Sequence, residues 1–345
     1  MKKHFIHVCK KITVFLVFVM IVFMLQSSKS TQQRLPLGVT ICGAEFGQTN
    51  MPGILNKDYI YPNLQQCKYY ASKGIRQIAL PFRWERIQKE LFGELDELNM
   101  SKIEEVLQFA KTTGIKVILD MHNYGHYRVN NEDVAIGVYP VTISAYADVW
   151  KKLVKRFKQY DNVLAYQIMA EPHDMGNGVW FNAAQEAINA IRITDINTPI
   201  IVDGYGWASA FKWQTFSDNL KNLYDVANKL VYSAHCYFDE DGSGTYAKGY
   251  DAAYYHPAIG IEKVKPFIDW LKANNKKGFV GEYGVPNKEA EWMPIMQNFL
   301  AYLQDNKIGA NYWAAGSWWQ SYPLSIEPVS GLDKPQMKVL EQFIK

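Results

Sequence analysis

Cysteine is scarce in this chain of 345 residues, and its four cysteines form no CxxC motif. This disfavours a cysteine-based metal site, and so few cysteines cannot form a dense disulfide framework. Cys9 lies in the N-terminal segment, and at most one disulfide can form among the remaining three, Cys42, Cys67 and Cys236. Cys42 and Cys236 lie in apolar runs, where a free thiol behaves as a small buried hydrophobe.

An excess of charge of either sign is also missing. Lys and Arg number 37 against 34 Asp and Glu, a net charge of +3. Five of the lysines lie in residues 1–30, which hold no acidic residue, so the remainder carries 32 basic and 34 acidic residues. Without a basic stripe, nothing indicates nucleic acid as a partner. A nearly neutral body suits an uncharged substrate, and we expect a monomer.

Only one long apolar run occurs, and it lies near the N-terminus. Ile12–Leu25 spans fourteen residues, follows four lysines and precedes Ser28-Lys29-Ser30, which fits a small-x-small cleavage site. The run is shorter than the roughly 20 residues that cross a bilayer. We predict a signal peptide at 1–30 and one secreted or periplasmic domain at 31–345. The alternative is an uncleaved N-terminal anchor, the only case in which a membrane would be a partner.

The rest of the chain alternates short apolar runs with segments of helical periodicity, and no linker or repeat divides it. Eight strands are predicted, at Val39–Phe46, Ile75–Phe82, Lys116–Asn123, Leu164–Glu171, Pro199–Tyr205, Leu230–Tyr237, Gly278–Gly284 and Gly309–Ala315. Helices are predicted at Ser101–Thr113, Ser144–Gln159, Trp180–Ile193, Ile261–Asn274, Trp292–Gln304 and Leu332–Ile344. Glycines before four strands resemble helix C′ stops: Gly74, Gly114, Gly278 and Gly309.

Alternating strands and helices predict parallel pairing with right-handed crossovers. The strands are almost continuously apolar, as expected when both faces of a sheet are covered. A doubly wound open sheet is the alternative, but it usually carries a GxGxxG loop after its first strand, and the stretch 43–47 reads GAEFG. The predicted fold is a single-domain α/β protein, a (β/α)8 TIM barrel.

Polar and aromatic residues gather where six of the predicted strands end. In a (β/α)8 barrel these carboxyl ends meet at the one face where active sites form. Glu171 and Glu282 follow the fourth and seventh strands, which lie on opposite sides of a narrow barrel. Two carboxylates about 5–5.5 Å apart are typical of a retaining glycosidase. The alternative is a pair of structural carboxylates neutralised by Arg83 or by histidine.

The order and spacing of several motifs resemble glycoside hydrolase family 5 of clan A, and most closely its branch of secreted endoglucanases and cellulases. The resemblance covers roughly residues 38–330 and rests on the stretches GVTICGAEFG, LPFRWERI, VILDMHNY, QIMAEPHD, SAHCYFDEDGSGT, GEYG and NYWAAGSW. It implies endo-hydrolysis of a β-linked glucan-type polysaccharide by double displacement through a covalent glycosyl-enzyme intermediate. The implied partner is an oligo- or polysaccharide, and neither a cofactor nor a metal is implied.

The resemblance implies a role for each matching residue. Glu171 is the implied acid/base and Glu282 the implied nucleophile. The implied supporting and substrate-binding residues are Arg83, which would hydrogen-bond the nucleophile, His122, Asn123, His235, Tyr237 and the platform Trp313. An arginine fork preorganises a carboxylate, and an aromatic face suits the apolar face of a sugar ring.

Residue 170 departs from the family pattern, because Ala170 stands where an asparagine is expected. The asparagine amide donates to the sugar 2-OH, a contact that strengthens in the transition state. Gln167 could replace it, the substrate could lack a free 2-OH, or the enzyme could be slow or inactive. A non-catalytic carbohydrate-binding barrel and a transglycosylase are therefore alternatives.

Three other features have less specific interpretations. Asp239 opens a stretch that resembles a calcium loop, but Tyr250 stands where a bidentate Glu is needed, so a polar loop is favoured. His122 and His126 lie on a loop rather than a helix, which disfavours a metallohydrolase. Glu45 ends the first strand and could contact substrate or form a salt bridge in the barrel.

Overall fold

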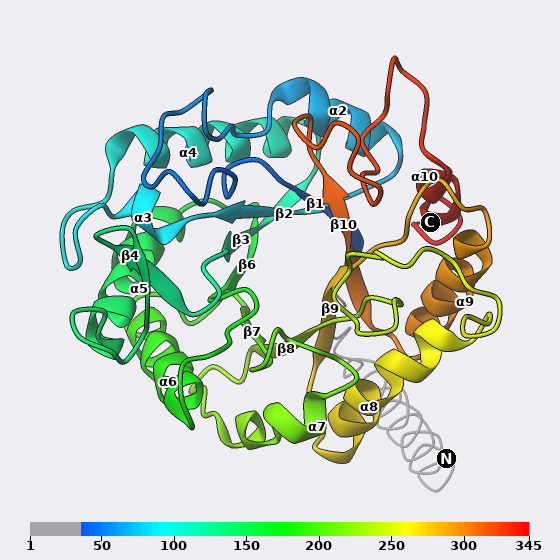
Figure 1. The fold of residues 1–345 in the computed structure, drawn as a ribbon. Helices are drawn as coiled ribbons and strands as arrows, with labels where there is room; N and C mark the ends of the chain where they lie inside the picture. The colour runs from blue at the N-terminus through cyan, green and yellow to red at the C-terminus, as the bar shows by residue number, and fades with distance from the viewer. Residues whose placement is uncertain (1–35, 345) are drawn as a thin grey trace, which may run out of the picture. The chain divides into compact units, whose positions relative to one another are not determined.

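Eight parallel strands close into a barrel in the computed structural model, which describes residues 36–344. The predicted signal peptide and anchor lie outside the described residues. The strands follow one another around the ring in chain order, and the last pairs with the first (Figure 1). Their bounds are β1 Leu37–Ile41, β2 Gln77–Phe82, β3 Lys116–Met121, β6 Val163–Gln167, β7 Ile200–Asp203, β8 Leu230–His235, β9 Gly278–Tyr283 and β10 Gly309–Ala315.

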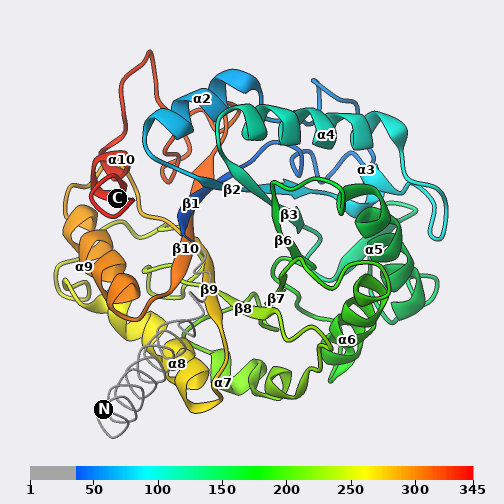
Figure 2. The same cartoon turned by 180° about the vertical axis from the view of Figure 1, so that it is seen from behind.

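The helices surround this ring on its outside, as both views show (Figures 1 and 2). They are α2 Leu64–Ser72, α3 Trp84–Ile87, α4 Glu97–Thr112, α5 Ile143–Phe157, α6 Val179–Arg192, α7 Trp213–Phe216, η1 Asp218–Asn222, α8 Ile259–Ala273, α9 Trp292–Asp305 and α10 Pro335–Leu340. A hairpin of β4 (His126–Val129) and β5 (Glu132–Ala135) lies between β3 and α5. The predicted (β/α)8 TIM barrel is confirmed. Within the described residues, no helix is both long and apolar enough to cross a bilayer.

Capping side chains explain where the helices differ from the sequence prediction. Helix α4 begins four residues before Ser101, because the Asp96 carboxylate accepts the backbone N–H of Asn99 and caps the helix there. Helix α2 was not predicted. Its start is a reciprocal capping box between Asn63 and Gln66, which occurs without an acidic residue in the first turn.

The glycine prediction is right at two positions and wrong at two. Gly74 and Gly114 follow α2 and α4 with φ of 87° and 73°, as C′ residues do. The other two, Gly278 and Gly309, are instead the first residues of β9 and β10. After α8 and α9, the left-handed position is taken by Asn275 and Lys307, with φ of 50° and 59°.

The barrel interior is apolar only in a small cluster, formed by Ala79, Ile118, Leu164, Ala165, Ile201, Val231 and Phe279. Residues two apart on a strand face the same side. Two positions beyond four of these residues, the same face carries the buried polar residues Asp120, Gln167, Asp203 and Ser233. The larger core lies around these strands and contains six tryptophans that lie on helices, Trp84, Trp150, Trp180, Trp213, Trp270 and Trp292. The polar residues therefore form a layer between the apolar cluster and the carboxyl ends of the strands.

The interior cluster predicts a large effect of one core substitution. Phe279→Ala should destabilise the protein by about 3–5 kcal/mol, because the fully buried ring cannot be replaced by neighbours on a closed barrel. Urea unfolding followed by circular dichroism measures this. The control is Ile193→Ala, whose side chain is 76% exposed and should change stability by less than about 0.5 kcal/mol. Equal effects of the two substitutions would contradict the assignment of Phe279 to the core.

Candidate active site

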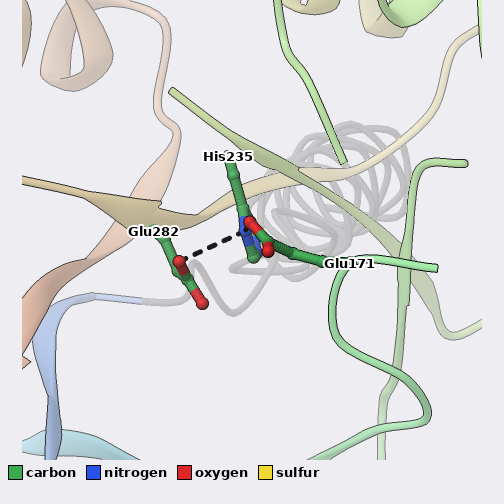
Figure 3. Close-up of side chains that lie close together, drawn as sticks. All are labelled: Glu171, His235 and Glu282. Atoms are coloured by element: carbon green, nitrogen blue, oxygen red, sulfur yellow. Dashed lines mark hydrogen bonds and ion pairs between the residues drawn. The ribbon is translucent and has the colours of Figure 1, made fainter. Parts of the chain in front are cut away.

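The two predicted catalytic carboxylates meet at one imidazole. His235 ends β8, Glu171 follows β6, and Glu282 lies near the end of β9. The Nδ1 of His235 is 2.7 Å from Oε1 of Glu171 and 3.4 Å from Oε2 of Glu282. One oxygen of each carboxylate lies within 4.8 Å of the other (Figure 3). The strands β6 and β9 are separated by β7 and β8 rather than lying opposite each other, and together with β8 they bring these side chains to a shared point.

Glu282 is almost completely buried, with 5% of its surface exposed. Burial raises the pKa of its carboxyl to about 7, and repulsion from Glu171 acts in the same direction. His235 lowers this pKa, as does the Tyr237 hydroxyl, which donates a hydrogen bond of 2.6 Å to Oε2 of Glu282. The site therefore holds a carboxylate whose ionisation depends on its immediate neighbours.

His235 carries the balancing charge. Burial alone would lower the pKa of its imidazole, but Glu282 and Asp203 raise it well above the usual value. Asp203, at the end of β7, lies 3.1 Å from Nε2 on the opposite edge of the ring. Acidic groups thus face both ring nitrogens, which favours the doubly protonated imidazolium.

His122 and Trp313 form a second group beside the carboxylates. The imidazole of His122 stacks on the indole of Trp313 with ring centres 5.4 Å apart. Asp120, buried in β3, lies 3.0 Å from its Nδ1. Although burial lowers the pKa of His122, Asp120 raises it to about 9. Trp313 is partly exposed on β10, as a residue that contacts a sugar must be.

Arg83 and Asn123 are tied into the loops that support the site. The Nη1 of Arg83 donates to the carbonyl of His122 at 2.7 Å, and its Nε lies 3.7 Å from Glu85. Its hydrogen bonds and ion pairs among the described residues do not include Glu282. Asn123 is fully buried, accepts the backbone N–H of Trp84 and donates to Glu85 at 2.9 Å. Both side chains thus hold the ends of β2 and β3 together.

Ala170 is fully buried, and its backbone is fixed on both sides. Its N–H donates to the carbonyl of Met121, and its carbonyl accepts from Tyr124. Gln167, proposed above as a substitute for the missing amide, donates instead to Oδ1 of Asp203 at 3.1 Å and is buried inside the barrel. Its amide is therefore engaged below the site.

Sequence reasoning missed Asp120 and Asp203. Each is a carboxylate inside an otherwise apolar strand, two residues beyond an inward-facing isoleucine. That pattern was the available signal, because an acidic residue facing the barrel interior needs a partner. Within residues 36–344, Glu45 forms no salt bridge: its Oε2 accepts the N–H of Gly43, while Oε1 is buried with no hydrogen-bond partner there.

Aromatic rings surround the carboxylates on more than one side. Beyond β10, the ring centre of Trp319 lies 5.9 Å from that of Trp313. Beyond β6 and β7, His173 stacks on Trp207 at 3.5 Å, and Trp207 is 52% exposed. Trp84, Trp180 and Trp213 are instead buried in the core.

The three central side chains also have the composition of a metal site, since Glu171, His235 and Glu282 each offer a donor atom. The distances between them fit hydrogen bonds better than they fit coordination of a shared metal ion. Nδ1 of His235 is at hydrogen-bond distance from Glu171, and Glu282 accepts a second hydrogen bond from Tyr237. The three cysteines of the described residues are all free and buried.

Residues 39–318 match the cellulase family, glycosyl hydrolase family 5. The chain belongs to this family. As a member of this family, it is an O-glycosyl hydrolase. Endo-beta-1,4-glucanase B of Emericella nidulans is 34% identical over 299 residues, which cover 86% of this chain and 87% of that protein.

Solved structures of this family superpose on the barrel. Pseudomonas stutzeri endoglucanase Cel5A in complex with cellobiose is 43% identical, with a TM-score of 0.85 over 90% of this chain and 92% of that one. XacCel5A in complex with cellopentaose is 36% identical, with a TM-score of 0.83 over 90% and 99% of the two chains. The family relatives thus include structures with cellobiose and cellopentaose bound.

The contact between Tyr237 and Glu282 predicts a shift in pH dependence. Tyr237→Phe removes a donor that stabilises the ionised carboxylate, so the pKa of Glu282 should rise by about one unit. The acidic limb of kcat/KM should move to higher pH by that amount, because the nucleophile must be ionised. An unchanged or lowered acidic limb would contradict this role, and the alkaline limb of the same profile is the internal reference.

Proposed function

We propose that this enzyme is a retaining endo-β-1,4-glucanase, with Glu171 as the acid/base and Glu282 as the nucleophile. The observation that carries the proposal is the closeness of the two carboxylates, since one oxygen of Glu171 lies within 4.8 Å of one oxygen of Glu282. Retaining glycosidases hold the pair about 5–5.5 Å apart, whereas inverting enzymes need about 6.5–9.5 Å to admit a water molecule. The named relatives and the cellobiose and cellopentaose complexes support the β-1,4-glucan substrate.

Two displacements follow from this geometry. Glu282 attacks the anomeric carbon while the carboxyl of Glu171 gives its proton to the departing glycosidic oxygen. In the second step, Glu171 takes a proton from water, whose oxygen displaces Glu282 from the same carbon. The hydrogen bond from Tyr237 keeps the attacking carboxylate oriented. His122 and Trp313 supply a polar edge and an aromatic face for the sugar at the point of cleavage.

The carboxylate roles predict distinct losses in two variants. Glu282→Ala should lower kcat on soluble β-1,4-glucan by at least about 10⁴-fold, and Glu171→Ala by about 10²–10⁴-fold. Added azide should rescue Glu171→Ala only on substrates with activated leaving groups, giving a β-glycosyl azide. Reducing-end assays measure the rates, and proton NMR of the first products gives the anomeric configuration. An α-configured first product would contradict double displacement.

The substitution at residue 170 supports a second candidate, a barrel that binds oligosaccharides with little turnover. The buried methyl group of Ala170 offers no donor, and Gln167 is engaged with Asp203. We favour a hydrolase of reduced rate, because both carboxylates and their imidazole are in place. We further propose that the barrel acts outside the cytoplasm, since basic, apolar and small residues follow one another at 1–30.

A restored amide separates the two candidates. Ala170→Asn should raise kcat/KM on cello-oligosaccharides by about 10-fold, because a recovered contact to the 2-OH strengthens in the transition state. Ala170→Ser is the matched control, since it adds a polar group too short to reach the same position. Tight oligosaccharide binding without reducing ends, in the wild type and in both variants, would favour the binding protein. Transfer products longer than the substrate would identify a transglycosylase.

A further inference from the structure

Asp203 is a carboxylate that no substrate can touch, because its side chain is fully buried inside the barrel. Its Oδ2 accepts the backbone N–H of Glu171 at 3.2 Å and lies 3.1 Å from Nε2 of His235. Its Oδ1 accepts the side-chain amide of Gln167. One buried carboxylate is therefore connected both to the main chain of the proposed acid/base and to the imidazole beside it.

The main chain of Glu171 needs such a contact. Its φ is 48°, in the left-handed region that side chains with a Cβ seldom adopt. Conformations of this kind persist at functional sites only when the surroundings hold them in place. The hydrogen bond from the Glu171 N–H to Asp203 fixes the peptide, and with it the direction in which the carboxyl points.

The ring of His235 is held between groups from several strands. Glu171, Asp203 and Glu282 face it from the ends of β6, β7 and β9, and Asp120 on β3 acts on it from a greater distance. The contact with Asp203 is a close ion pair rather than a linear hydrogen bond, since no acceptor in the described part of the chain is aligned with the Nε2 proton. Without Asp203, the ring would face acidic groups on its Nδ1 edge only.

We propose that Asp203 is a positioning residue for the acid/base step of the proposed hydrolysis, which fixes the peptide of Glu171 and the ring of His235. The alternative is that Asp203 merely satisfies buried polar groups such as Gln167 and thereby stabilises the barrel. The two roles predict different losses of kcat/KM across substrates when Asp203 is substituted. A positioning role lowers kcat/KM, which reports the steps up to the glycosyl-enzyme, only for substrates whose leaving oxygen needs a proton.

The test is Asp203→Asn, which keeps the shape of the side chain and removes its charge. Aryl β-cellobiosides with leaving groups of graded acidity are compared with cellotetraose. We expect kcat/KM to fall about 10- to 100-fold for cellotetraose and for phenyl cellobioside. For 2,4-dinitrophenyl cellobioside, which leaves without protonation, we expect a change below about 3-fold. Equal losses on all substrates, or no loss on any, would overturn the proposal.

The matched control is Asp225→Asn. Asp225 forms a buried ion pair with Arg192 at 2.7 Å and precedes β8, so it lies at the opposite end of the barrel from the carboxylates. This variant loses a buried charge partner without touching the site. Its rates, measured below the unfolding temperature of both variants, should show the wild-type dependence on leaving group.

A spectroscopic measurement keeps the inference separate from the proposed hydrolysis. The ¹⁵N shifts of the His235 ring should show an imidazolium in the wild type at neutral pH, with a lower pKa in Asp203→Asn. An unchanged pKa in the variant would overturn the positioning role even if activity falls. If the wild type cleaves neither cellotetraose nor the activated cellobioside, the proposed hydrolysis fails, and the ring titration still decides the role of Asp203.

Discussion

The imidazole of His235 allows two acidic groups to approach each other in a buried place. Glu282 is nearly inaccessible to water, and the charge of Glu171 alone would raise the pKa of its carboxyl further. A cation beside both oxygens offsets part of this repulsion, because burial of an unpaired charge is very costly. The proposed reaction at this face of the barrel depends on the balance between the charges of the two carboxylates and the imidazole. The ion pair between Asp203 and the other edge of the ring extends this charge network into the barrel interior.

Closure of the sheet makes the balance possible. Each strand contributes its carboxyl end to one rim, so residues more than a hundred positions apart in sequence become neighbours. The apolar cluster around Phe279 fills the interior below, and the polar layer that includes Asp120 and Asp203 lies between that cluster and the rim. Beneath the rim, Asp120 is hydrogen-bonded to His122, and Asp203 accepts hydrogen bonds from Gln167 and Glu171. Such support is what holds reacting groups in position without water.

Much of this architecture could be predicted from the sequence, because apolar runs and segments of helical periodicity alternate along the chain. Apolar runs marked all eight barrel strands, and polar residues after them marked Glu171, His235 and Glu282 as neighbours. The hairpin β4–β5 was missed because its strands are only four residues long and largely solvent-accessible, so they carry little apolar alternation. Helices α3 and α7 are also four residues long, which is too short for a helical period to show.

The interior carboxylates were harder to find, for a different reason. A sequence shows that Asp203 ends an apolar strand, but not that its two oxygens are shared among Gln167, Glu171 and His235. Those contacts join three strands, and only the curvature of the closed barrel sets which side chains converge. The expected contact between Arg83 and Glu282 illustrates the same limit, since the guanidinium is instead hydrogen-bonded to the carbonyl of His122. Residue type and strand position constrain which strands contribute to the site, while pairing within it follows from packing.

Ala170 shows how separable the parts of such a site are. Its backbone is bonded to Met121 and Tyr124, so the main chain that carries Glu171 is held without any side chain at position 170. The asparagine expected from the family resemblance acts on the sugar 2-OH, whereas the proposed proton transfer and attack involve Glu171 and Glu282. Losing the amide therefore removes stabilisation of the sugar while leaving the carboxylate separation unchanged. The retained carboxylate separation favours a hydrolase of reduced or altered activity over a non-catalytic binding barrel. A barrel that only binds carbohydrate does not need two acidic groups that converge on a buried imidazole.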